Sequence, residues 1–315
     1  LNHWTEEIWS GVKCINKRFV RVCSLLLVCS LCTISGTGCG ENRLEDAFEA
    51  DLPGIGIQTS EESSKIPYFA SDLCVTDTDV QDIEADTEDA LAACFFNLNE
   101  KKVLYAKNIH ERMYPASTTK IMTALVALDK GDLDAQTTVS KEAITFSESG
   151  VSTAKLKEGD VLTLRQLLYA LLTVSANDAA NVIAEQIAGS QDAFVEMMNQ
   201  EAQKIGATNT HFVNANGLHS EDHYTTVYDL YLMFNAAMQH EEFLQMLQEK
   251  EYQASYQAAD GTTVEAVWST TNQFTKGDVT VPDEVTAVGG KTGTTTAAMS
   301  CLVQLFEDAQ GEQYV

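Results

Sequence analysis

The chain has 315 residues, enough for one large domain or two smaller ones, and a hydrophobic content of 44% is enough to build a core. The formal net charge of -26 argues against nucleic-acid binding, because so acidic a chain has no basic surface to meet phosphates. We therefore expect no nucleic-acid partner.

The first 38 residues have the order of a secretory signal peptide. A basic stretch over 13–21 precedes a short apolar run over 22–34, and small residues follow over 35–38. The apolar run is shorter than the roughly 20 residues that a membrane-spanning helix needs. The sequence thus predicts a secreted or extracytoplasmic protein. The alternatives are that the segment is retained and tethers the chain to a membrane, or that Cys39 is lipidated.

Residues 39–88 are predicted to form an acidic, disordered linker. Acidic side chains recur throughout this segment, and only Arg43 and Lys65 oppose them. A segment with so little apolar periodicity buries too little surface to offset the entropy of the chain. The folded domain is accordingly predicted over 89–315.

Strands and helices follow in a simple order. Strands are expected over 91–98 and 102–106, short irregular elements over 131–163, and strands again after residue 252, over 285–306 and from 312. Between them, helices are expected from Pro115 onward and over 163–172, 178–188, 190–205, 226–239 and 241–250. This order predicts an α+β fold, in which a helical block packs beside an antiparallel sheet built from both chain ends.

No metal or cofactor is expected. Apart from Cys39, at the edge of the leader, the cysteines after it are Cys74, Cys94 and Cys301. They are widely spaced and form no C-x-x-C pair, so neither a zinc site nor a disulfide framework is indicated. Cys94 and Cys301 lie in apolar runs and are predicted to be buried small hydrophobes. His219 and His223 lie in a predicted loop and are expected to be solvated.

The first string that could carry chemistry is Ser117-Thr118-Thr119-Lys120. Residues at i and i+3 share a helix face, so the Ser117 hydroxyl and the Lys120 amine can meet. A serine becomes a good nucleophile when a base removes its proton, and lysine is such a base only if burial or a nearby cation lowers its pKa. Taken alone, the string also fits an ordinary capped core helix.

Two further polar strings follow. Ser175-Ala176-Asn177 stands at a predicted break between two buried helices, where either the hydroxyl and amide serve a substrate or they simply cap a helix. Lys291-Thr292-Gly293 precedes an apolar strand. Either its lysine and threonine hydroxyl bind a carboxylate, or the string is a polar hairpin turn. It is not a phosphate-binding loop, because that pattern requires glycine where Val285 stands.

In this order the strings form the S-x-x-K, S-x-N and K-T-G set of penicillin-binding proteins and class A β-lactamases. Their surroundings over 114–123, 174–181, 210–218 and 223–230 resemble the low-molecular-weight penicillin-binding proteins that are serine-type D-alanyl-D-alanine carboxypeptidases, peptidase S11-like. The resemblance runs from about residue 90 to the end. It implies a β-lactamase/transpeptidase-like fold and the removal of the terminal D-alanine from peptidoglycan stem pentapeptides at the bacterial cell envelope. β-Lactam antibiotics are then expected to inhibit it by acylating the same serine.

The resemblance also implies roles for the catalytic side chains. Ser117 attacks the carbonyl between the two D-alanines, and Lys120 is its general base. Asn177 holds the substrate amide. Ser175, linked to Lys291, relays a proton to the departing D-alanine.

The substrate-binding positions come from the third string. Lys291 and Thr292 bind the terminal carboxylate, and the backbone N–H groups of Ser117 and Thr294 form the oxyanion hole. On this basis we expect the Ser117 hydroxyl to lie against both amines, at Lys120 and at Lys291.

One departure and three alternatives accompany this interpretation. The family continues past the position of Val315, so the domain is expected to be truncated at its C-terminus, with an incomplete sheet. One alternative is a class A-like β-lactamase, although no E-x-x-L-N string follows Asn177. Another is a non-catalytic domain that binds cell wall or β-lactams. Endopeptidase action on cross-links would use the same residues.

Overall fold

A computed structural model of the chain describes residues 70–315. The signal peptide predicted over 1–38 and most of the acidic linker predicted over 39–88 lie outside these residues. Within 70–315, every helix is too short or too polar to cross a membrane.

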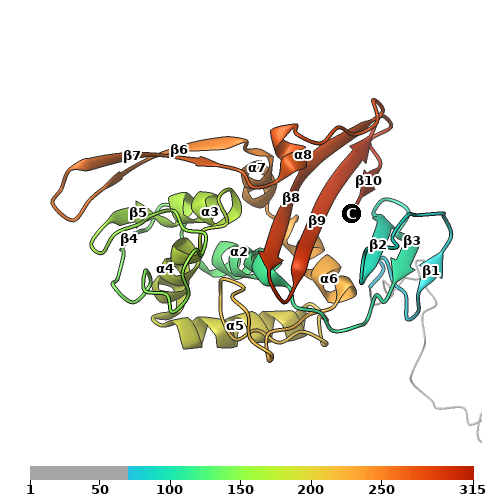
Figure 1. The fold of residues 1–315 in the computed structure, drawn as a ribbon, viewed down its shortest axis with the longest axis horizontal. Helices are drawn as coiled ribbons and strands as arrows, with labels where there is room; N and C mark the ends of the chain where they lie inside the picture. Colours follow the sequence, from blue (N-terminus) through green and yellow to red (C-terminus); the bar gives the residue numbers. More distant parts are fainter. Residues whose placement is uncertain (1–69) are drawn as a thin grey trace, which may run out of the picture. The chain divides into compact units, whose positions relative to one another are not determined.

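The central sheet is antiparallel and draws its strands from both ends of the described chain. Its six strands follow the order β1-β3-β2-β10-β9-β8. Figure 1 shows the late strands β8 and β9 on the same side of the helices as the early strands β2 and β3. The strands are β1 (Val80–Gln81), β2 (Ala93–Asn97), β3 (Lys102–Lys107), β8 (Val285–Thr295), β9 (Met299–Asp308) and β10 (Gln313–Tyr314).

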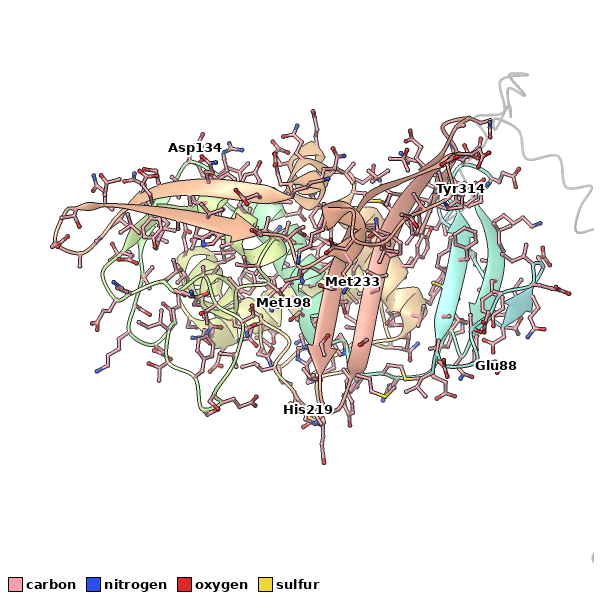
Figure 2. All side chains as sticks on the ribbon, turned by 45° about the horizontal axis from the view of Figure 1, so that its top comes forward. Glu88, Asp134, Met198, His219, Met233 and Tyr314 are labelled. Carbon is pink, nitrogen blue, oxygen red and sulfur yellow. The ribbon has the colours of Figure 1, made fainter. Side chains whose placement is uncertain are left out.

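The helical block surrounds helix α2. The first eight residues of α2 are all buried, and the helix packs against α3, α4, α5 and α6. Met198 and Met233, both fully buried, lie in the interior of this block (Figure 2). The helices are η1 (Ala116–Thr119), α2 (Lys120–Lys130), α3 (Leu164–Leu172), α4 (Asn177–Ala188), α5 (Gln191–Lys204), α6 (Val227–Ala237), α7 (Glu241–Gln248) and α8 (Gln273–Lys276).

The capping residues explain why the helix boundaries were predictable. Thr163 begins α3 with a capping box in which Gln166 bonds back to it, while Ser190 and Thr226 cap α5 and α6 through their hydroxyls. Helices and sheet together confirm the predicted α+β class.

A second, four-stranded sheet was not predicted. Its order is β4-β5-β6-β7, from β4 (Gln136–Thr138), β5 (Val161–Thr163), β6 (Glu251–Gln257) and β7 (Thr263–Ser269). The region 131–163 was expected to be irregular. Two of these strands, β4 and β5, have only three residues each. β5 pairs with β6 of the β6–β7 hairpin through Val161 and Gln257, which are far apart in sequence. No local pattern signals such a pairing.

The folded region begins earlier than the predicted boundary at residue 89. Cys74 is completely buried; its N–H donates to the Tyr231 hydroxyl, and its carbonyl accepts from the Tyr228 hydroxyl. β1 pairs with β3, and Asp79 accepts hydrogen bonds from the backbone N–H groups of Asn108 and Ile109. Residues 70–88 are therefore part of the fold, because the burial of Cys74, the pairing of β1 with β3 and the hydrogen bonds to Asp79 hold them in place despite their acidic composition.

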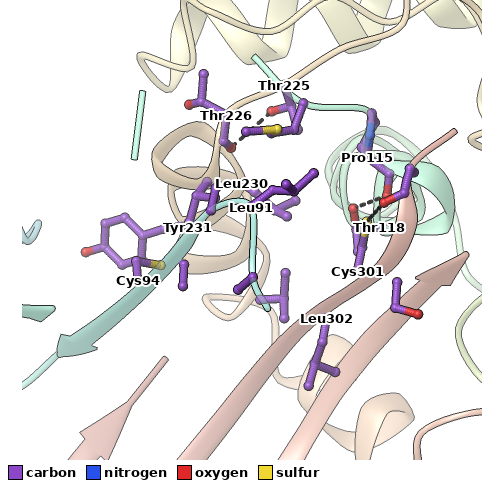
Figure 3. Close-up of a pocket in the computed structure, with 18 of the residues that line it drawn as sticks. Leu91, Cys94, Pro115, Thr118, Thr225, Thr226, Leu230, Tyr231, Cys301 and Leu302 are labelled. Atoms are coloured by element: carbon purple, nitrogen blue, oxygen red, sulfur yellow. Dashed lines mark hydrogen bonds between the residues drawn. The ribbon is translucent and has the colours of Figure 1, made fainter. Parts of the chain in front are cut away.

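The strand predicted near the C-terminus is β10, and it lies between β2 and β9. Tyr314 pairs with Asn97 on one side and Phe306 on the other. A groove of about 700 Å³ adjoins it, lined by β2, β9, α6 and the segment before η1 (Figure 3). Cys94 and Cys301 line this groove and are only half-buried, which corrects their predicted burial.

Candidate active site

The three polar strings meet where η1, α2, α4 and β8 come together. Ser117 lies in η1, and Lys120 is the first residue of α2. Ser175 and Asn177 lie at the break between α3 and α4, and Lys291 lies on β8, which packs against η1. Residues from three separate parts of the chain thus form one site.

The Ser117 turn differs from the predicted α-helix. Residues 116–119 form a 3₁₀ turn, in which side chains at i and i+3 eclipse one another. The Lys120 Nζ accordingly lies 3.1 Å from Ser117 Oγ. Ala116, just before the serine, has a φ of 48°, a conformation that non-glycine residues rarely adopt. Such strain is typical of functional turns.

Lys120 is completely buried, and its amine has three partners. Besides Ser117 Oγ, Nζ donates to Asn177 Oδ1 at 2.7 Å and to the backbone carbonyl of Asn216. Burial, and then the neighbouring Lys291 ammonium, hold the pKa of Lys120 well below its usual range. A neutral amine has two hydrogens and one lone pair. With both hydrogens accepted by oxygens, its lone pair is left for the Ser117 hydroxyl proton.

Asn216 belongs to a loop that the sequence analysis assigned no role. Its contribution is a main-chain carbonyl, so its residue type carries little signal; the only local hint is the glycine that follows. Gly217 has a φ of +86°, and an added Cβ would lie 2.0 Å from the Ala116 carbonyl oxygen. The loop and the strained turn of the nucleophile are therefore in direct backbone contact.

Gly217→Ala is expected to lower the acylation rate of Ser117 by at least about 100-fold, because the methyl group would clash with the Ala116 carbonyl and displace the loop that carries the Asn216 carbonyl. Gly189→Ala is the matched control: Gly189 has a φ of +79° with open space around it. Both variants carry a backbone strain of roughly 1–2 kcal/mol. Equal acylation rates in the two variants, measured with a fluorescent penicillin, would contradict the role of the loop.

Lys291 is the second buried amine, with 1% of its surface exposed. Its Nζ donates to Ser175 Oγ at 3.0 Å and to the Thr292 carbonyl at 2.7 Å. Among residues 70–315, no hydrogen bond joins Lys291 to Ser117, so the expectation that both amines contact that hydroxyl was half right. Burial lowers the pKa of Lys291 to about 7. Ser175 has a φ of 58°, a second strained position.

The end of β8 approaches the nucleophile through a glycine. An added Cβ at Gly293 would lie 2.9 Å from the Ser117 backbone nitrogen, so only glycine permits this contact. Thr294 follows and is exposed, while Thr292 is half-buried. The Thr292 hydroxyl lies 2.7 Å from that of Thr271, which the sequence analysis did not select.

The histidines of the predicted loop differ from each other. His219 is exposed, as predicted, but His223 is 2% exposed and makes two hydrogen bonds, so its predicted solvation was wrong. The sequence could not separate them, because both lie among polar residues; His223 is buried beside Phe212 and Thr119.

Comparison with known proteins agrees with the geometry. The peptidase S11 family, described as D-alanyl-D-alanine carboxypeptidase, matches residues 79–311. The D-alanyl-D-alanine carboxypeptidase DacB2 of Mycobacterium tuberculosis is 37% identical over 209 residues, which are 66% of this chain and 67% of that protein. DacF of Bacillus subtilis is 38% identical over 156 residues, or 49% of this chain, and the match spans only 40% of DacF.

Solved structures give the same likeness. The crystal structure of the Streptomyces K15 DD-transpeptidase superposes with a TM-score of 0.68 at 30% sequence identity, covering 74% of this chain and 90% of that one. The predicted β-lactamase/transpeptidase-like architecture is thereby confirmed.

Proposed function

Because this chain belongs to the peptidase S11 family of D-alanyl-D-alanine carboxypeptidases, we propose that it removes the terminal D-alanine from peptidoglycan stem pentapeptides. The observation that carries the proposal is the buried Lys120 amine, which is bonded to Ser117 Oγ and whose pKa is held well below its usual range by burial. A module that only bound cell wall would have no use for such a base.

The first half of the reaction forms an ester on Ser117. Its Oγ attacks the carbonyl carbon of the penultimate D-alanine while Lys120 takes the hydroxyl proton. The C–N bond to the last D-alanine then breaks. Ser175, bonded to Lys291, relays to the departing amine the proton that Lys120 took, so both residues return to their starting state. In the second half, water attacks the ester and releases the shortened peptide and Ser117.

The substrate is held along the outer strand of the sheet. β8 ends the strand order, so within the described sheet its outer edge is available to an extended peptide. Lys291 and Thr292 receive the terminal carboxylate, Asn177 the peptide amide, and the N–H groups of Ser117 and Thr294 the oxyanion. Because such peptides belong to the cell wall, we infer that the protein acts outside the cytoplasm, which agrees with the predicted signal peptide.

The deciding experiment incubates the protein with a synthetic stem pentapeptide and measures free D-alanine. Release of D-alanine, and a penicillin adduct located on Ser117 by mass spectrometry, are the expected results. Peptide that binds without release would favour the non-catalytic reading. Rapid nitrocefin turnover without an accumulated adduct would favour a β-lactamase. Adding an amine acceptor tests transfer, since the Streptomyces K15 relative is a DD-transpeptidase.

The affinity for a D-Ala-D-Ala peptide is expected to fall as pH rises above about 7. With a pKa of about 7, Lys291 is charged below that pH and neutral above it, and a carboxylate ligand favours the charged form. Binding then takes up a proton, so the Kd rises by up to about tenfold per pH unit. Calorimetry with the Ser117→Ala variant measures this without turnover. A peptide that ends in an amide is the control, and its Kd should show no such rise. If the Kd of the peptide with a free carboxylate stayed constant to about pH 9, the assignment of Lys291 would be contradicted.

A further inference from the structure

The Asn216 carbonyl is held on Lys120 by the loop over residues 213–218, here called the 213–218 loop. Within the loop, Asn214 Oδ1 accepts from the N–H groups of Asn216 and Gly217. Thr123 on α2 donates to the Ala215 carbonyl at 2.6 Å. These contacts hold residues 214–217 of the loop. The first residue, Val213, is held by a different contact.

His223 supplies that contact. The Val213 N–H donates to its Nδ1 at 3.1 Å, and its Nε2 lies 2.8 Å from Thr119 Oγ1. A backbone N–H can only donate, so Nδ1 is the unprotonated nitrogen and Nε2 carries the hydrogen that is donated to Thr119. Burial, assisted by His211 and Lys120, lowers the pKa of His223 to about 4, so the ring remains neutral in this arrangement at pH 7.

Thr119 connects this ring to the catalytic turn. It lies between Ser117 and Lys120 in η1, and only 1% of its surface is exposed. We propose that His223 is a positioning residue: by bonding Val213 on one side and Thr119 on the other, it holds the 213–218 loop against the turn and keeps the Asn216 carbonyl on the Lys120 amine. This inference rests on the proposed function, since it assigns His223 a part in the acylation of Ser117.

The contact between the Asn216 carbonyl and the Lys120 amine controls the direction of the Lys120 lone pair. One amine hydrogen is fixed by Asn177 and the other by Asn216, and both must be held for the lone pair to face Ser117 Oγ. Small displacements of reacting groups have large effects on rate. Loss of the His223–Thr119 bond is therefore expected to slow acylation without weakening the initial binding of the ligand.

The test compares three variants of buried threonines in η1. Thr119→Val removes the acceptor with little change of shape, and Thr119→Ser keeps it. Thr118→Val is the control, because within the described part of the chain the Thr118 hydroxyl bonds only the nearby Pro115 carbonyl. The acylation rate constant and the dissociation constant of the non-covalent complex are measured separately with a fluorescent penicillin. Thr119→Val should lower the rate constant about tenfold at an unchanged dissociation constant. Thr119→Ser and Thr118→Val should remain near wild type.

A double variant tests whether both residues act through one bond. His223→Asn keeps an acceptor for the Val213 N–H and lacks the Nε2–H donor, so it should match Thr119→Val, and the double variant should be no slower than either single one. The inference would be overturned if the double variant lost the product of the two single losses in acylation rate. It would also be overturned if Thr119→Val acylated at the wild-type rate, or if Thr118→Val lost as much rate as Thr119→Val.

Nitrogen NMR of the wild-type imidazole is independent of variant folding. It should show the Nε2–H tautomer of His223, with no titration from about pH 5 to about pH 8; the other tautomer would also overturn the inference. Failure of penicillin to acylate the wild-type protein would overturn the proposed function together with this inference. Acylation of the wild type with no effect of Thr119→Val would overturn this inference alone.

Discussion

Replacing Ser117 with alanine is expected to abolish both D-alanine release and labelling by fluorescent penicillin, a loss of at least about 10⁴-fold. Among residues 70–315, the Ser117 hydroxyl is the only one bonded to the amine that removes the proton, so no other hydroxyl there is placed to take over. The Ser175 hydroxyl is committed to Lys291 instead. Gel fluorescence after penicillin treatment measures the loss.

The Ser117→Ala variant should keep its fold, since the change removes one small, half-buried side chain. Thermal unfolding close to that of the wild type is the control. Labelling that persists undiminished in a folded Ser117→Ala protein would mean that another residue is acylated, and the assignment of the nucleophile would be wrong.

Replacing Lys120 with methionine is expected to lower the acylation rate by about 10²–10⁴-fold, the usual contribution of a general base. Methionine resembles lysine in length and fills the same buried space without an amine. It leaves Asn177 Oδ1 and the Asn216 carbonyl without a donor. The acylation rate constant with penicillin is the measurement.

Lys120→Arg separates the base from a simple hydrogen-bond donor. A guanidinium can donate to the same oxygens but stays protonated, so it cannot take the proton of Ser117. The arginine variant should therefore be about as slow as the methionine variant. If it kept more than about a tenth of the wild-type rate, Lys120 would be a donor that orients Ser117 and not the base.

The parts of the site that depend on side-chain type were predictable from sequence. Ser117, Lys120 and Ser175 had distinctive neighbours and spacing, and the structure brings them together with Lys291. Their roles remain predictions that the variants above test. The 3₁₀ turn at Ser117 was not predicted, because its conformation follows from packing against Gly217 and Gly293 rather than from the local sequence.

What the sequence could not supply depends on long-range contacts. The acceptor at Asn216 is a main-chain atom, and the burial of His223 follows from its packing near Thr119. The start of the fold was missed for a similar reason. Cys74 lies within an acidic stretch, and only its burial against Tyr231 reveals that residues 70–88 belong to the domain.

The joining of β2 to β10 has a consequence for how the chain folds. The backbone of Phe96 bonds that of Val315, so an early strand acquires its inner neighbour only when the last described residues have been made. At about 5–20 residues per second, ribosomal synthesis leaves this strand waiting on the order of ten seconds. Late, non-local closure of this kind slows folding. Until those residues are in place, one edge of β2 has unpaired backbone groups that can bond to another chain.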